Sequence, residues 1–256
     1  MNFDQTCISE TLEQLGLTVG SNVFLHADLG KFGLPEGAVC RDSLCEIYYN
    51  AIIDILGSTG NLVVPAFTYS LPRREVFDIE APSLNCGIFS DWLIRNGYGK
   101  RSWDPNISVV CVGEDADVLA AHTPVITYGP GSIFEELLER NFHSLNFNRN
   151  AASTFVHFAE KKLRVDYRFE KFFSGSMIQN SQLKPVNRFL WVSRQNEKYQ
   201  ANFSKFSELA YELGLCVSKE LGYGKIEIMT MMDQFKIVEF GLKQDPYFLT
   251  NGFFRV

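Results

Sequence analysis

The chain has 256 residues, of which 46% are hydrophobic and 21% are charged, and its formal net charge at pH 7 is −6. This composition excludes an intrinsically disordered chain and provides for a large core, so we expect a single domain over residues 1–256. A mildly acidic protein is poorly suited to bind nucleic acid or an anionic membrane, and better suited to bind small cationic molecules.

The six cysteines are scattered and form no CxxC pair, which is typical of reduced thiols in a cytosolic protein. The four histidines form no HxxxH or Cys-His cluster, so we expect no metal site. The sequence has no run of about 18 apolar residues, and its first residues lack the basic and apolar regions of a signal peptide. We therefore expect a cytoplasmic protein without a membrane span.

Helical and strand patterns alternate along most of the chain, which predicts the α/β class. The expected helices cover 5–16, 40–56, 86–95, 114–121, 133–140, 203–214 and 230–243, and the expected strands cover 22–26, 61–65, 107–113, 142–147, 188–193 and 226–229. Residues 66–82 form a long aperiodic stretch. Residues 165–200 also lack clean periodicity, and we expect there an irregular excursion that covers the site.

A loop rich in polar residues follows the first expected strand. It begins at His26, contains Lys31 and Phe32, and ends at Gly33. In α/β sheets, ligands bind at the carboxyl ends of the strands, and glycine there lets the backbone approach a ligand. Lys31 could meet a phosphate. An ordinary glycine turn remains the alternative interpretation of this loop.

Residues 150–160 predict the start of a helix, with Ser153 or Thr154 as its N-cap. His157 and Glu160 stand three residues apart, so they share one face of that helix. A histidine titrates near neutral pH, and a neighbouring acid can orient it, which is what proton abstraction needs. A solvated surface pair is the competing interpretation.

Several well-known enzyme signatures are missing from the sequence. No GxGxxG follows a strand, and there is no P-loop, no GxSxG elbow and no hexapeptide repeat. A cysteine nucleophile stays open, because Cys86 or Cys111 could form an acyl-enzyme together with a histidine. Cys111, however, lies among valines, as a core thiol does.

Seven segments resemble motifs of the aminoglycoside 3-N-acetyltransferase family, in the family's order and over nearly the full length of the chain. They are LHADLGKFG at 25–33, GNLVVPAFT at 60–68, FD…PS with a following glycine at 77–87, RSWDPNIS at 101–108, YGPGS at 128–132, TFVHFAE at 154–160 and GLKQDPYFL at 241–249. Each motif is weak alone, and the ordered set is fairly specific.

The resemblance implies an α/β fold with a mixed central sheet flanked by helices, distinct from the common GNAT acetyltransferase fold. It also implies direct transfer of acetyl from acetyl-CoA to an amine of an amino sugar, without a metal. His157 would be the general base, Glu160 would orient it, and Thr154 would donate a hydrogen bond to the thioester oxyanion.

The resemblance also indicates residues for the two substrates. Contacts with CoA would come from the loops at 26–33 and 101–108, through His26, Lys31, Phe32, Gly33, Arg101, Ser102 and Ser108. Contacts with a cationic acceptor would come from carboxylates at Asp78, Glu80, Asp91 and Asp104. Each of these carboxylates could equally be an ordinary surface group.

The chain departs from the family pattern in four places. Asp104 stands where the family has a histidine, Ala27 and Asp28 replace two serines, Ser153 replaces an asparagine, and Asp91 replaces a glutamate. These departures point away from a classical deoxystreptamine antibiotic and keep a nucleotide-linked amino sugar of surface-glycan synthesis as a rival acceptor. Basic residues for a nucleotide would be Arg73, Arg74, Lys100, Arg101 and Arg149.

Two other functions remain open, namely ping-pong transfer through a cysteine and an inactive homologue that binds a sugar or acyl-CoA. A homodimer is also kept open.

Overall fold

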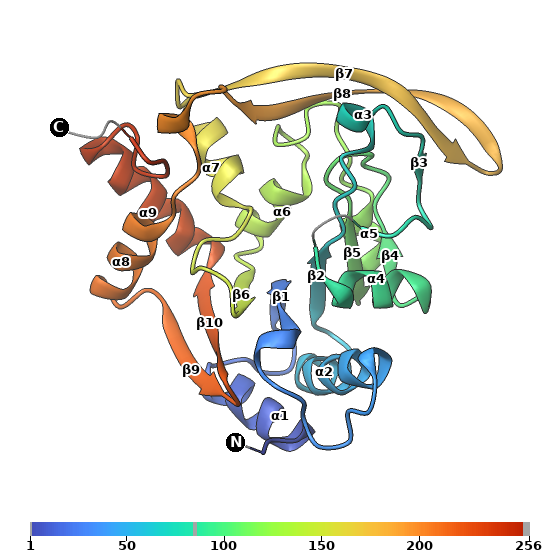
Figure 1. The fold of residues 1–256 in the computed structure, drawn as a ribbon, viewed down its shortest axis with the longest axis vertical. Helices are drawn as coiled ribbons and strands as arrows, with labels where there is room; N and C mark the ends of the chain where they lie inside the picture. The colour runs from blue at the N-terminus through green and yellow to red at the C-terminus, as the bar shows by residue number, and fades with distance from the viewer. Residues whose placement is uncertain (1, 84–85, 253–256) are drawn as a thin grey trace.

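The computed structural model describes residues 2–83 and 86–252. Its centre is a seven-stranded sheet with the strand order β4-β5-β2-β1-β6-β10-β9 (Figure 1). The strands are β1 (Asn22–Ala27), β2 (Asn61–Pro65), β4 (Lys100–Arg101), β5 (Val109–Gly113), β6 (His143–Phe147), β9 (Val217–Leu221) and β10 (Gly224–Thr230).

The sheet is parallel at its centre and antiparallel at its flanks. Strand β1 pairs in parallel with β2 and β6, while β10 runs antiparallel to β6 and β5 runs antiparallel to β2. The carboxyl ends of β1, β2 and β6 therefore meet at one edge, where ligands bind in sheets of this kind. The predicted mixed central sheet is confirmed.

Helices cover both faces of the sheet because the central strands are apolar on both sides. Phe24 and Val63 belong to one buried cluster, and their neighbours Val23, Leu25 and Leu62 belong to the other, as alternation along a strand requires. The first cluster includes α5 (Ala116–Ala120), α6 (Ile133–Glu139), α7 (Val156–Lys162), α8 (Ser204–Glu212) and α9 (Met231–Gln244). The second includes α1 (Gln5–Gln14), α2 (Arg41–Leu56) and α4 (Ile88–Arg95).

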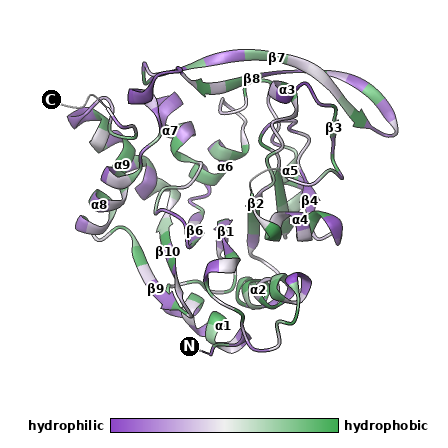
Figure 2. Cartoon of the chain, in the orientation of Figure 1, coloured by the Kyte–Doolittle hydropathy of each residue, from purple (hydrophilic) through white to green (hydrophobic). Residues whose placement is uncertain are grey.

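Residues 165–200 are not the irregular excursion that we expected. Strands β7 (Arg168–Gln179) and β8 (Gln182–Ser193) form a long antiparallel hairpin, which arches over one end of the molecule (Figure 1). The turn between them uses positive φ angles, 52° at Asn180 and 59° at Ser181, which suit the twist of a tight hairpin. An Asn-Ser turn is a weaker sequence signal than Asn-Gly, and polar and apolar segments mix along both strands (Figure 2). For these two reasons the sequence of this regular hairpin shows no clean strand periodicity.

The aperiodic stretch at 66–82 holds two short elements, α3 (Ser70–Arg73) and β3 (Phe77–Asp78). Strand β3 joins the hairpin by pairing with Met177 and Ile178 of β7. Strands β4 and β9, which form the two edges of the central sheet, are not among the strands that we expected. Among the described residues, no helix is long and apolar enough to cross a membrane.

Candidate active site

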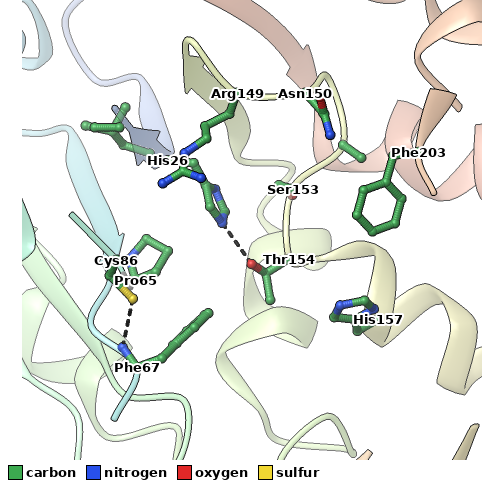
Figure 3. A pocket seen from close by; sticks show the side chains of 13 residues that line it. His26, Pro65, Phe67, Cys86, Arg149, Asn150, Ser153, Thr154, His157 and Phe203 are labelled. Atoms are coloured by element: carbon green, nitrogen blue, oxygen red, sulfur yellow. Dashed lines mark hydrogen bonds between the residues drawn. The ribbon is translucent and has the colours of Figure 1, made fainter. Parts of the chain in front are cut away.

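A pocket of about 270 Å³ opens at the carboxyl edge of the parallel strands. His26 from β1 and Pro65 from β2 line one side of it, and Thr154 and His157 line the other (Figure 3). Arg149, in the loop after β6, and Cys86 also line the pocket. The pocket lies at the strand ends because the first loop residues after parallel strands converge there.

Helix α7 carries the central pair. Nδ1 of His157 lies 2.8 Å from Oε2 of Glu160, as the spacing of three residues on one helix face allows. A carboxylate can only accept, so Nδ1 carries the proton and Nε2 keeps a free lone pair. Burial and the charge of Arg168 lower the pKa of His157, against the opposing influence of Glu160. The imidazole is therefore neutral at pH 7 and able to accept a proton.

Glu160 is only 1% exposed and has two further partners from the segment after the helix. The hydroxyl of Tyr167 donates to its Oε1 at 2.8 Å, and Nε of Arg168 lies 2.7 Å from its Oε2. Burial alone would raise the pKa of Glu160, but His157, Arg168 and Tyr167 together lower it. The carboxyl group is therefore ionised and held in one orientation.

Thr154 and His26 make a second contact across the pocket. Nε2 of His26 lies 2.8 Å from the hydroxyl oxygen of Thr154 (Figure 3). Burial and the nearby charge of Arg149 lower the pKa of His26 to about 3, so this ring is neutral at working pH. A neutral ring that donates through Nε2 leaves the Thr154 hydroxyl hydrogen free to point into the pocket. Neither Ser153 nor Thr154 caps α7, which begins after Phe155 without a side-chain cap.

Several polar side chains of the 101–108 loop form hydrogen bonds with other parts of the protein. Nη1 of Arg101 donates to the carbonyls of Ile79 and Ala81, and Nη2 donates to that of Ala66. The Ser108 hydroxyl also donates to Ala66, at 2.6 Å, and accepts from Nε of Arg101. The donors that we expected to face CoA are therefore engaged with the protein itself.

Ser102 and Asp104 support the same loop. The Ser102 hydroxyl accepts from the backbone N–H of Val109 at 2.9 Å. Oδ1 of Asp104 accepts from the backbone N–H groups of Asn106 and Ile107, at 2.8 and 3.0 Å. Asp104 is 5% exposed and does not line the pocket of His157, so its carboxylate closes a turn where we expected an acceptor contact.

The other expected acceptor carboxylates also lie away from this pocket. Oδ1 of Asp91 accepts from the backbone and hydroxyl of Ser83, each at 2.7 Å. Asp78 accepts from the backbone N–H of Glu80 at 3.0 Å, and Glu80 lines a separate cavity beside Arg101. The structure does not bring these three carboxylates to His157.

In the 26–33 segment, His26 and Ala27 line the pocket. Lys31 forms an exposed ion pair with Asp28 at 3.1 Å, and Phe32 is fully buried. Gly33 has a φ of 86°, a conformation that favours glycine, and it packs against Tyr223.

The thiols have the properties of packed, protonated cysteines. Cys86 lines the pocket, and its sulfur accepts from the backbone N–H of Phe67 at 3.2 Å. Burial raises the pKa of Cys86 to about 11, so little thiolate exists at neutral pH. Cys111 is fully buried in the sheet, and burial raises its pKa as well. Within residues 2–83 and 86–252, no three His, Cys, Asp or Glu side chains are grouped so that they could hold a metal ion.

Sequence reasoning missed Tyr167 and Arg168 as partners of Glu160, and Phe203 as a wall of the pocket. Arg149 is one of the five basic residues that we expected could serve a nucleotide, and the structure places it at the pocket. Its place after a central parallel strand was the signal that could have identified it.

Comparisons with known proteins agree with this architecture. The aminoglycoside 3-N-acetyltransferase family model matches residues 24–243. Aminoglycoside acetyltransferase AAC(3)-Xa superposes with a TM-score of 0.82 at 18% identity, covering 95% of this chain and 93% of that one. AAC-IIIb in a binary complex with CoASH gives a TM-score of 0.80 at 18% identity, with 95% and 98% covered.

AAC-VIa bound to sisomicin gives a TM-score of 0.78 at 18% identity, with 94% of this chain and 97% of that one covered. No curated protein matches the sequence. The solved structures establish the fold, and the family match spans most of the chain, including the His157 helix and the strands that form the pocket. On these grounds the chain belongs to the aminoglycoside 3-N-acetyltransferase family and is an N-acetyltransferase.

Proposed function

We propose that the protein transfers acetyl directly from acetyl-CoA to a primary amine of an amino sugar, with His157 as the general base. The observation that carries this proposal is the free Nε2 of a neutral His157, whose other nitrogen is held by the buried Glu160 at 2.8 Å. An alkyl ammonium has no lone pair, so a base in the pocket must take its proton before attack.

The reaction balances without a protein-bound intermediate. The ammonium first loses one proton through His157 to solvent. The resulting amine nitrogen forms a bond to the thioester carbon as His157 takes a second proton, and the carbon–sulfur bond then breaks. The departing thiolate of CoA receives the proton. The Thr154 hydroxyl would donate to the thioester oxygen while charge develops there, and one such donor is typically worth about 3 kcal/mol.

The test is a thiol-release assay with acetyl-CoA and an amine acceptor. His157→Ala should lower kcat by roughly 10²–10⁴-fold, the usual contribution of a positioned base. His122→Ala is the matched control, because that histidine does not line the pocket and its Nδ1 instead lies 3.1 Å from the carbonyl of Gly131. Turnover of His157→Ala within a few-fold of wild type would refute the assignment.

Two classes of acceptor fit the proposal. Aminoglycosides follow from the family's description and from the AAC-VIa complex with sisomicin. A nucleotide-linked amino sugar is favoured by the charges around the pocket. Among the described residues that line it, none is a carboxylate and Arg149 is the one cationic side chain. An adjoining groove of about 690 Å³ shares Arg149 and adds Lys225, Glu227 and Glu208.

This distribution of charge matters because a polycationic antibiotic needs several carboxylates close to the reacting amine. Lys225 and Glu227 already pair with each other at 3.0 Å, so Arg149 and Glu208 are the remaining charged residues among those described in the groove. An acceptor with one amine and a phosphate would meet the guanidinium of Arg149 with its anionic group.

The acceptor is identified by thiol release against a panel of aminoglycosides and a panel of nucleotide-linked amino sugars. If the acceptor is anionic, Arg149→Gln should raise its KM at least tenfold and leave the KM for acetyl-CoA nearly unchanged. A rise in the KM for acetyl-CoA alone would assign Arg149 to the CoA phosphates. Turnover with aminoglycosides alone would identify an aminoglycoside as the acceptor.

A further inference from the structure

The carboxylate of Glu160 is contacted by three side chains from two elements. His157 and Arg168 both approach Oε2, at 2.8 and 2.7 Å, while the Tyr167 hydroxyl occupies Oε1. The contact of Arg168 is an ion pair without hydrogen-bond geometry, so it acts through charge. Arg168 is only 10% exposed, and its interaction with Glu160 is therefore weakly screened by solvent.

A short turn of the chain brings these partners back to the helix. Helix α7 ends at Lys162, and Arg164 turns the backbone with a φ of 57°. The hairpin then begins at Arg168, directly beside the helix that carries Glu160 (Figure 1). The root of the β7–β8 hairpin is thus part of the support of the active site.

Two opposite charges act on His157, because Glu160 raises its pKa and Arg168 lowers it. A lone Glu160 would stabilise the imidazolium ion and retain the proton that the base takes from the amine. The cation of Arg168, on the same carboxylate oxygen, opposes that stabilisation. Glu160 then orients the ring through Nδ1 without making the ring strongly basic.

We propose that Arg168 and Tyr167 are positioning residues for the base: they keep Glu160 ionised and fixed, and Arg168 prevents that carboxylate from trapping His157 as imidazolium. This inference rests on the proposed function of His157. It assigns to the hairpin root a task in catalysis that the family resemblance did not indicate.

The remaining titratable groups near His157 do not supply this effect. Tyr128 packs edge-on against the ring with centroids 6.0 Å apart, and burial keeps its pKa well above 10. Cys86 and His26, from the opposite side of the pocket, are uncharged at neutral pH because burial raises the thiol pKa to about 11 and lowers the imidazole pKa to about 3. Arg149 lines the same pocket. Glu160 and Arg168 are the two charged groups that shift the pKa of His157.

The experiment is an NMR titration of the His157 ring protons, which is practical because the chain has four histidines. Arg168→Gln should raise the His157 titration midpoint by about one pH unit or more, the usual effect of one nearby charge. Arg168→Lys should keep the midpoint within a few tenths of a unit. Tyr167→Phe should raise it by less than Arg168→Gln does. Lys162→Gln is the matched control, since it removes a charge from the exposed side of the same helix and should shift nothing.

The acid limb of the kcat/KM profile should move to higher pH together with the NMR midpoint. An unchanged or lowered midpoint in a folded Arg168→Gln variant would overturn the proposal, as would an equal shift in Arg168→Lys. If Arg168→Gln does not fold, the other two variants decide. A Tyr167→Phe protein with the wild-type midpoint and kcat, or an Arg168→Lys protein with a raised midpoint, overturns the proposal.

The titration needs no substrate, so it tests Arg168 even if no amine is acetylated. Conversely, the expected shifts in a protein that fails to acetylate any amine would refute the proposed function alone.

Discussion

Two segments resemble family motifs equally well, and the structure uses their polar side chains in opposite ways. In 101–108, the side chains of Arg101, Ser102, Asp104 and Ser108 form hydrogen bonds within the protein itself. In 154–160, His157 keeps a free nitrogen, and the Thr154 hydroxyl lies at the pocket within 2.8 Å of Nε2 of His26. The polar side chains of the first segment stabilise the conformation of the loop, and those of the second face the pocket, where a ligand could meet them. The residue types alone do not distinguish these two roles.

What separates them is how much hydrogen-bonding capacity remains after the fold is formed. Arg101 has its guanidinium distributed over three carbonyls and a hydroxyl, so a ligand would have to displace protein contacts.

The largest effect on stability should come from Arg101→Ala. The change removes the donors of several buried carbonyls, and we expect a loss of about 3–5 kcal/mol in the free energy of unfolding. Urea denaturation measures it. Arg95→Ala is the matched control, because the pair of Arg95 with Asp42 is exposed and should matter little. A stable Arg101→Ala protein with a greatly raised KM for acetyl-CoA would show that Arg101 belongs to the CoA site.

Asp104→Ala should cost about 2 kcal/mol, since two backbone N–H groups lose their acceptor. Asp104→Asn keeps an oxygen in place and should recover most of this loss. Turnover per folded molecule should stay within a few-fold of wild type in both variants. A normal unfolding curve with a raised KM for the acceptor would instead place Asp104 at the substrate.

The next effect depends on pH. The pKa of His26 falls from 6.5 to about 3 on folding, so the unfolded chain binds more protons between these values. The contribution of His26 to stability is complete above about pH 6.5 and is lost as the pH falls toward 3, by at most roughly 1.4 kcal/mol per pH unit. Thermal unfolding midpoints between pH 8 and 4 should fall less steeply in His26→Asn than in wild type. Identical slopes would mean that His26 is not the group that limits acid stability.

Cys86→Ala should have the smallest effect, with kcat within a few-fold of wild type. The Cys86 thiol is protonated at neutral pH, and direct transfer needs no thiolate. Mass spectrometry of the enzyme incubated with acetyl-CoA should show no acetylated protein. An acetyl group on Cys86, together with lost activity in the variant, would establish ping-pong transfer.

The sequence predicted well whatever depends on local spacing. His157 and Glu160 meet because three residues separate them on a helix, and the pocket lies where parallel strands end. Strand β2 was predicted at its observed bounds because it is a continuous apolar run between turn residues.

The missing parts depend on the path of the chain in three dimensions. Arg168 could not be predicted as a partner of Glu160, because the contact depends on the turn at Arg164 and the start of the hairpin. Likewise, the guanidinium of Arg101 donates hydrogen bonds to the carbonyls of residues 66, 79 and 81. These residues lie far from Arg101 in the sequence, so no local pattern predicts the contacts.

A link between the active site and α9 has a consequence for the order of events during protein synthesis. Gln234 of α9 accepts hydrogen bonds from the backbone N–H and hydroxyl of Ser153, directly before the helix of His157. Strand β10, which precedes α9, must also pair with β6 across nearly 80 residues of chain. On the ribosome, the segment around His157 would therefore emerge long before the residues that hold it in place. A chain released before Gln234 would contain the catalytic base and its acid but lack part of the scaffold that orients them, so catalytic competence arises only late in translation.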